Sequence, residues 1–143
     1  MSAAITTIRK RAALPLPRTP ARYTSCLIGS AMVLVTAEGE IDACNGRKFA
    51  KYIEDVLDAK RRLIVDLRGL TFFGTPGFSA LHYVNVTCSR RDVNWVLVPG
   101  PEASRMLNIC DPQRGLPVAD TLDKAIATVS RPPRNHLRPL PRT

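Results

Sequence analysis

The residues best placed to do chemistry lie in the tetrapeptide Gly74-Thr75-Pro76-Gly77. A hydroxyl residue followed by proline is typical of a helix start, with Thr75 as the N-cap and Pro76 in the first helical position. The free N–H groups and the dipole at such a point favour a phosphate, so Thr75 is a candidate phosphoacceptor. The competing interpretation is a well-capped helix and nothing more, which the capping statistics favour.

Thiols are the next candidates for chemistry. The chain has four cysteines, at Cys26, Cys44, Cys88 and Cys110. They contain no CxxC spacing, and the only histidines are His82 and His136, so the sequence predicts no metal site. In a reducing compartment we expect buried, reduced thiols. The alternative is a redox-sensitive pair, for which Cys44 and Cys110 are the candidates.

No set of residues indicates catalysis. His82 lies in the middle of an expected helix, without a serine or cysteine motif around it. The glycine-containing turns lack the GxxxxGK[ST] and GxGxxG spacings that bind nucleotide phosphates. Asp66 lies inside an apolar strand, where burial would require a hydrogen-bonded or ionic partner. The sequence therefore predicts a protein that is not an enzyme and needs no cofactor.

A strand and a helix must position the tetrapeptide. The apolar run 63–67 has the length of a buried strand, and Arg68-Gly69 is expected to end it. Phe72 and Phe73 then return to the core, and a helix is expected over 76–90.

The rest of the chain continues this alternation. The remaining expected elements are a hairpin of strands 23–28 and 31–37 ended by Gly39, a helix over 43–60 capped by Asp42, a strand over 93–98, a helix over 101–110, a brief edge strand at 116–118, and a helix over 122–129 capped by Asp120 or Thr121. This order predicts a single α/β domain with a mixed sheet of four or five strands and about four helices.

Charge divides the chain into three parts. The net charge is +9, but residues 23–130 hold twelve basic and twelve acidic residues and are neutral. We therefore expect a folded domain over 23–130 between disordered, basic, proline-containing tails over 1–22 and 131–143. Such tails can contact acidic surfaces, anionic lipid or RNA without specificity, or simply keep the domain soluble, and no specific nucleic-acid site is expected.

Targeting signals are not evident in the sequence. The basic cluster Arg9-Lys10-Arg11 precedes only a short apolar stretch broken by proline, which is unlike a secretory signal. No apolar run approaches the roughly 20 residues of a membrane span. We expect a cytoplasmic protein.

The strand, turn and helix over 63–81 resemble the signature of the STAS domain, the fold of bacterial anti-sigma factor antagonists. Gly39-Glu40-Ile41-Asp42 is similar to the Gly-Glu-Leu-Asp of that family, and segments 104–107 and 122–125 resemble its last two helices. The resemblance covers about residues 24–129. One departure is in the turn, which reads Asp-Ser-Ser-Gly or Asp-Ser-Thr-Gly in the family and lacks the acidic residue here.

The resemblance implies a function. It implies that the chain binds an anti-sigma factor, often a kinase, through the residues Gly74, Thr75, Pro76, Gly77 and Phe78, and so releases a sigma factor. Phosphorylation of the turn hydroxyl would end binding. Because the acidic residue is absent and proline follows, Thr75 is predicted to be mainly a cap, phosphorylated slowly or not at all. The alternative is a STAS subunit of a membrane lipid or anion transport system.

Overall fold

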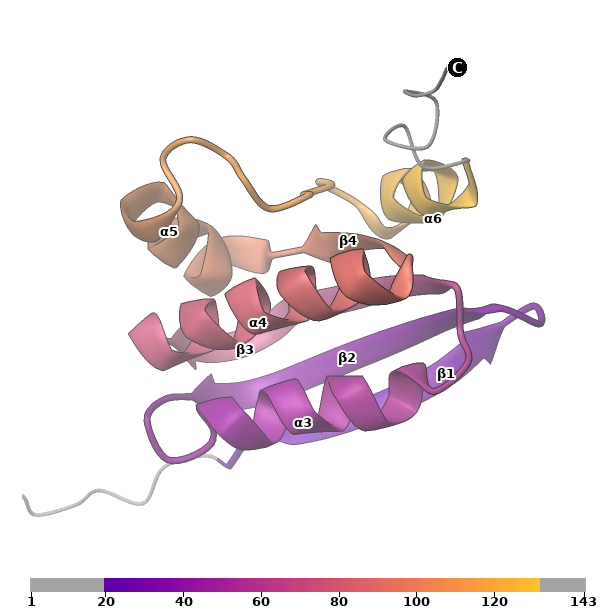
Figure 1. Ribbon diagram of the computed structural model, residues 1–143. Helices are drawn as coiled ribbons and strands as arrows, with labels where there is room; N and C mark the ends of the chain where they lie inside the picture. The colour runs from indigo at the N-terminus through magenta and orange to yellow at the C-terminus, as the bar shows by residue number, and fades with distance from the viewer. Residues whose placement is uncertain (1–19, 132–143) are drawn as a thin grey trace, which may run out of the picture.

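The computed structural model describes residues 20–131, in which helices and strands alternate after an initial hairpin (Figure 1). The elements are β1 (Arg22–Ile28), β2 (Met32–Ile41), α3 (Gly46–Leu57), β3 (Arg62–Phe73), α4 (Thr75–Arg91), β4 (Asn94–Val98), α5 (Gly100–Cys110) and α6 (Leu122–Ser130). The predicted α/β domain with a mixed sheet of four or five strands is confirmed, and the sheet has four. The predicted disordered tails lie almost wholly outside the described residues.

The four strands form one sheet in the order β1-β2-β3-β4. β1 and β2 pair antiparallel through the short turn that begins at Gly29, which has a φ of +70°. β2, β3 and β4 pair in parallel, with α3 and α4 as the connections between them. The predicted hairpin and parallel crossover are therefore both present, and β3 occupies an interior position between two parallel neighbours.

The two faces of the sheet carry hydrophobic cores of different size. Val65 and Leu97 point into the larger core, which α3, α4 and α5 cover. Their neighbours Ile64 and Val96 point to the opposite face, where α6 packs. Figure 1 shows α3 and α4 running side by side in front of the strands, whereas α6 lies beyond β4. The sheet thus presents its paired helices on one face only.

Gly39 does not end β2, as the sequence suggested, but lies inside it. Two register shifts interrupt the pairing with β3, one between Thr36 and Glu38 and one between Gly39 and Glu40. Gly39 has a φ of +95°, and a Cβ there would meet the backbone of Pro20, with the carbonyl carbon 3.1 Å away. The glycine therefore marks a bulge and a close approach of two backbone segments.

Gly69 likewise does not end β3, which continues to Phe73. Its partner on β2 is Glu38, and a Cβ on Gly69 would lie 2.9 Å from the Cγ of that side chain. The glycine makes room for a neighbour within the ladder. The strand predicted over 63–67 was therefore too short. In the sequence, a glycine required by packing cannot be distinguished from one required by a turn.

The start of α3 also differs from the prediction. The helix begins at Gly46, and Asp42 is not its N-cap. Asp42 instead accepts a hydrogen bond from the backbone N–H of Cys44 at 2.8 Å, and its own N–H donates to the side chain of Asn45 at 2.9 Å. These polar residues build a separate turn between β2 and α3.

The elements after β4 agree closely with those predicted from the sequence. The expected edge strand at 116–118 is reduced to a single bridge between Leu97 and Val118. Thr121 caps α6, since its hydroxyl accepts the backbone N–H of Lys124 at 3.1 Å. Within residues 20–131, no helix is both long and apolar enough to cross a membrane.

Candidate functional site

The tetrapeptide Gly74-Thr75-Pro76-Gly77 forms the junction of β3 and α4. Gly74 has an extended backbone, and its N–H donates to the carbonyl of Ile41 at 3.0 Å. This bond ties the turn to the end of β2. The Gly74 carbonyl in turn accepts the N–H groups of Gly77 at 2.9 Å and Phe78 at 3.3 Å, which starts the helix.

Thr75 is not the N-cap of α4, contrary to the prediction. The cap position belongs to Gly74, Thr75 is the first helical residue, and no side chain caps this end. The physical reason is positional, because a capping oxygen must come from the residue before the helix and glycine has no side chain. The Thr75 side chain is exposed, so its hydroxyl is open to solvent instead of bonded to the helix.

Gly77 is a packing residue. It is buried, and a Cβ there would overlap the ring of Phe73, with Cδ1 and Cζ only 2.7 Å away. Gly74 is buried as well. Of the five residues predicted to bind a partner, only Thr75 is exposed, while Pro76 and Phe78 are partly exposed. The two glycines hold the turn in place, and the other three offer surface.

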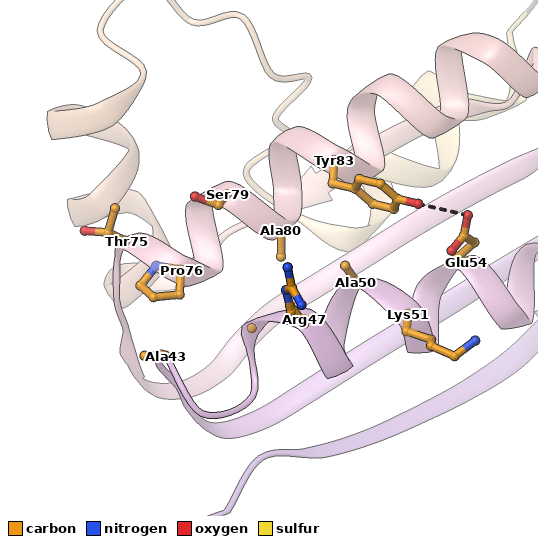
Figure 2. Close-up of a pocket in the computed structure, with 11 residues that line it drawn as sticks. Ala43, Arg47, Ala50, Lys51, Glu54, Thr75, Pro76, Ser79, Ala80 and Tyr83 are labelled. Carbon is orange, nitrogen blue, oxygen red and sulfur yellow. Dashed lines mark hydrogen bonds between the residues drawn. The ribbon is translucent and has the colours of Figure 1, made fainter.

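A groove opens beside this turn, between α3 and α4 (Figure 2). Its volume is about 730 Å³. The floor consists of small residues from both helices, chiefly Gly46, Ala50 and Ala80. A Cβ on Gly46 would lie 3.0 Å from the carbonyl oxygen of Pro76, so the two helix starts touch at this end. The groove exists because small side chains leave the space between the helices unfilled.

The walls of the groove differ in charge along their length. At the far end the Tyr83 hydroxyl donates to Glu54 at 3.2 Å, and Arg91 lies 3.6 Å from the same carboxylate oxygen. Nearer the turn, the Arg47 side chain is exposed and makes no hydrogen bond or ion pair with any residue in the described range. Lys51, one turn further along α3, pairs with Asp55 at 3.2 Å. The end of the groove beside Thr75 is therefore the basic end.

The α3 wall was missed by the sequence analysis. The sequence predicted a helix over 43–60, but the analysis did not place this helix beside α4. A signal did exist, because Gly46 and Ala50 are four residues apart and Ala80 lies four residues beyond Pro76. Small residues at this spacing allow two helices to approach closely.

A second, smaller cavity of about 340 Å³ lies on the other side of α3, between the start of β1 and the turn that holds Asp42 and Cys44. Tyr23 lines it, and its ring is stacked on Phe49 at a centroid distance of 5.7 Å and tilted against Tyr52 at 5.2 Å. Burial raises the pKa of Tyr23, and its hydroxyl has no hydrogen-bond partner among residues 20–131.

The cysteines at 26, 44, 88 and 110 are all reduced and unpaired in the structure. Cys44 is exposed in the turn before α3, whereas Cys110 ends α5 with its sulfur 3.4 Å from that of Met106. Burial raises the pKa of Cys88 to about 12, against a smaller opposing effect of Arg91, so this thiol stays protonated at neutral pH. A redox role for Cys44 and Cys110 stays a prediction.

Asp66 has the partner that its burial required. Arg68 donates to both carboxylate oxygens, from Nε at 2.9 Å and from a terminal nitrogen at 2.8 Å, and its backbone N–H donates at 3.1 Å. Burial raises the pKa of Asp66, but these bonds and the positive charge outweigh it, so the net shift is downward. His82 is exposed. Neither residue lines the groove.

Comparison with known proteins gives concordant results. The family model of the STAS domain matches residues 27–125. The chain is 31% identical over 99 residues to the anti-sigma-F factor antagonist RsfA of Mycobacterium tuberculosis, covering 66% of this chain and 77% of that protein. It is 29% identical over 97 residues to osmosensory protein A of the same species, covering 65% of this chain and 61% of that relative's length.

Solved structures share the fold. An anti-sigma factor antagonist from Mycobacterium paratuberculosis superposes with a TM-score of 0.67 at 22% identity, covering 78% of this chain and 96% of that one. The antagonist SpoIIAA in its unphosphorylated form gives a TM-score of 0.63 at 16% identity, with coverage of 76% and 96%.

Proposed function

This chain belongs to the STAS domain family, and we propose that within the family it acts as an anti-sigma factor antagonist. It would bind an anti-sigma factor and so free the sigma factor that the anti-sigma factor holds. The observation that carries the proposal is the 31% identity to an anti-sigma-F factor antagonist over 77% of that relative's length. Shared fold with two structurally characterised antagonists supports it.

The mechanism requires a preformed surface and no chemical step. Gly74 is tied to the end of β2, and Gly77 packs on Phe73, so the turn between them is held before any partner arrives. A rigid surface loses little conformational entropy on binding. Thr75, with the exposed parts of Pro76 and Phe78, would meet the anti-sigma factor and exclude the sigma factor by occupying its site. The domain would work in the cytoplasm, over residues 23–130, without catalysis.

Regulation by phosphate would act at Thr75. Its hydroxyl is exposed and caps nothing, so modification would break no structural bond. A phosphate would add roughly −1.5 to −2 charge to the contact surface at neutral pH. Gly74 replaces the acidic residue of the family's turn, and Pro76 removes an N–H donor. We therefore propose that a family-type kinase modifies Thr75 slowly or not at all.

The test is displacement of a sigma factor. Each anti-sigma factor of the source bacterium is purified with its fluorescently labelled sigma factor, and fluorescence anisotropy reports release as this chain is added. We expect saturable release from one pair. Thr75→Arg should weaken the antagonist at least tenfold, because the residue is exposed in the turn, and the thermal midpoint should not change.

Ser89→Arg is the matched control for this substitution. Ser89 is also an exposed hydroxyl residue of α4, but it lies near the opposite end of the helix. Equal activity of both variants would place the contact surface elsewhere. Failure of the wild-type chain to bind any anti-sigma factor of its cell would contradict the proposed function.

A further inference from the structure

The groove between α3 and α4 follows two neighbouring helices. Gly46 meets Pro76 at one end and Glu54 meets Tyr83 at the other, so the two helices run alongside each other in the same direction. The α4 wall presents Thr75, then Ser79 one turn on, then Tyr83. From Thr75 to Tyr83 there are eight residue steps, which at 1.5 Å rise per residue span about 12 Å, or about two helical turns.

The floor of the groove is apolar and low. Ala50 and Ala80 face each other across it, and each ends in a methyl group. Larger side chains at these positions would fill the space. Tyr83 is 48% exposed and is held by its bond to Glu54, so it offers a fixed aromatic wall. An aliphatic or aromatic side chain from outside would find contacts on three sides.

The charge on the groove walls determines which partner segments can bind favourably. Glu54 is already engaged by Tyr83 and Arg91 at the far end. Arg47 lines the groove between the two helices, beside Ala80 in Figure 2, and its side chain makes no ion pair with a described residue. A guanidinium binds a carboxylate strongly and with defined geometry. The terminal segments of this chain carry arginine and no acidic residue, so they do not match the groove.

We infer that this groove receives an acidic amphipathic helix of the anti-sigma factor, with an apolar side chain over Ala50 and Ala80 and a carboxylate paired with Arg47. The inference rests on the proposed function and deepens it, because it states the chemistry of the partner segment. Recognition of a helix in a groove between two helices places apolar anchors three or four residues apart. The groove continues directly from the turn, since Thr75 and Pro76 line both.

The first test is a charge reversal at Arg47, with the anti-sigma factor that the wild-type chain binds as the probe. Arg47→Glu should weaken binding at least tenfold by calorimetry, and the affinity should lose most of its dependence on salt. The fold should survive, because Arg47 is exposed and has no described partner. Arg90→Glu is the matched control, since Arg90 is exposed on α4 and lines no part of the groove. It should bind as the wild type does.

The second test identifies the occupant. A photo-crosslinking amino acid at Ser79, which is exposed on the α4 wall, is irradiated in the complex, and the crosslinked peptide is sequenced by mass spectrometry. We expect a partner segment with an acidic residue within about one turn of an apolar one. A crosslink to a second copy of this chain, or to a segment without acidic residues, would overturn the inference.

The outcomes separate the two proposals. Wild-type binding that Arg47→Glu leaves unchanged would overturn the acidic helix and leave the antagonist function intact. No binding by the wild type to any anti-sigma factor would overturn both.

Discussion

The starts of α4 and α6 look alike in sequence and are built in different ways. Each has a threonine at the point where the helix begins. At α6, Thr121 precedes the helix and its hydroxyl accepts the N–H of Lys124. At α4, Thr75 is already inside the helix, Gly74 precedes it, and no side chain caps the end. The α4 start is held by contacts of its glycines instead, Gly74 with Ile41 and Gly77 with Phe73.

Because of this difference, one threonine hydroxyl stabilises its helix and the other is available to a partner. The Thr121 hydroxyl is used by its own helix and cannot also serve a partner without loss of the cap. The Thr75 hydroxyl is exposed and is left available, because backbone packing has taken over the structural task. A helix start that is fixed by glycine contacts can therefore present its side chains outward, and the groove beside it begins at the same residue.

The largest expected effect is from filling the space at Gly77. Gly77→Ala would place a Cβ against the buried ring of Phe73, and overpacking of a core costs up to about 3 kcal/mol. The free energy of unfolding from urea denaturation should fall by this amount. Phe73→Leu in the same chain should recover part of the loss, giving a double mutant less destabilised than the two single variants added together. A neutral Gly77→Ala would show that the α4 start is not held by this contact.

The sequence sufficed to predict the elements and their order, because apolar periodicity and turn residues carry that information. It failed where a residue type has two physical uses. Gly39 and Gly69 could end strands or allow close contacts within them, and only the pairing of β2 with β3 decides between these. The same ambiguity led Thr75 to be read as a cap, since capping depends on the backbone of one position.

The candidate site was half predictable for a related reason. The turn is continuous in sequence and carries the family pattern, so its residues could be identified. The groove combines α3 and α4, and the side-by-side placement of two helices is set by tertiary packing on β2, β3 and β4. Arg47 was therefore not identified as a candidate site residue from the sequence.

The second expected effect is a dependence on pH that arises in β3, the strand that leads into α4, and not at either helix start. The pKa of Asp66 is lowered in the folded protein by its bonds to Arg68. Its contribution to stability is therefore complete above the unfolded-state pKa of about 4 and is lost as pH falls through the lower folded-state pKa. Asp66→Asn should cost about 1.5 kcal/mol at neutral pH, the lower end of the range for a hydrogen bond to a charged group.

Urea denaturation from pH 2 to pH 7 provides the measurement. The wild type should lose stability as the pH is lowered below about 4, and the gap between it and Asp66→Asn should narrow there. A gap that stays constant over this range would show that the ionised carboxylate of Asp66 does not contribute. Because the Thr121 cap is a neutral hydroxyl, Thr121→Ala should lower the whole curve without changing its slope.

The smallest effects are the most informative, since they compare the two threonines directly. Thr121→Ala should destabilise the protein by about 1 kcal/mol, because it removes the hydrogen bond to Lys124 and leaves that N–H without its cap. Thr75→Ala should change stability by less than about 0.5 kcal/mol, the range for an exposed residue without structural bonds. Binding to the anti-sigma factor should respond in the opposite order, weakening for Thr75→Ala and staying constant for Thr121→Ala, which calorimetry on the folded variants can measure. Equal losses of stability at the two positions would mean that Thr75 caps α4 after all, and its hydroxyl would then not be available to a partner or to a kinase.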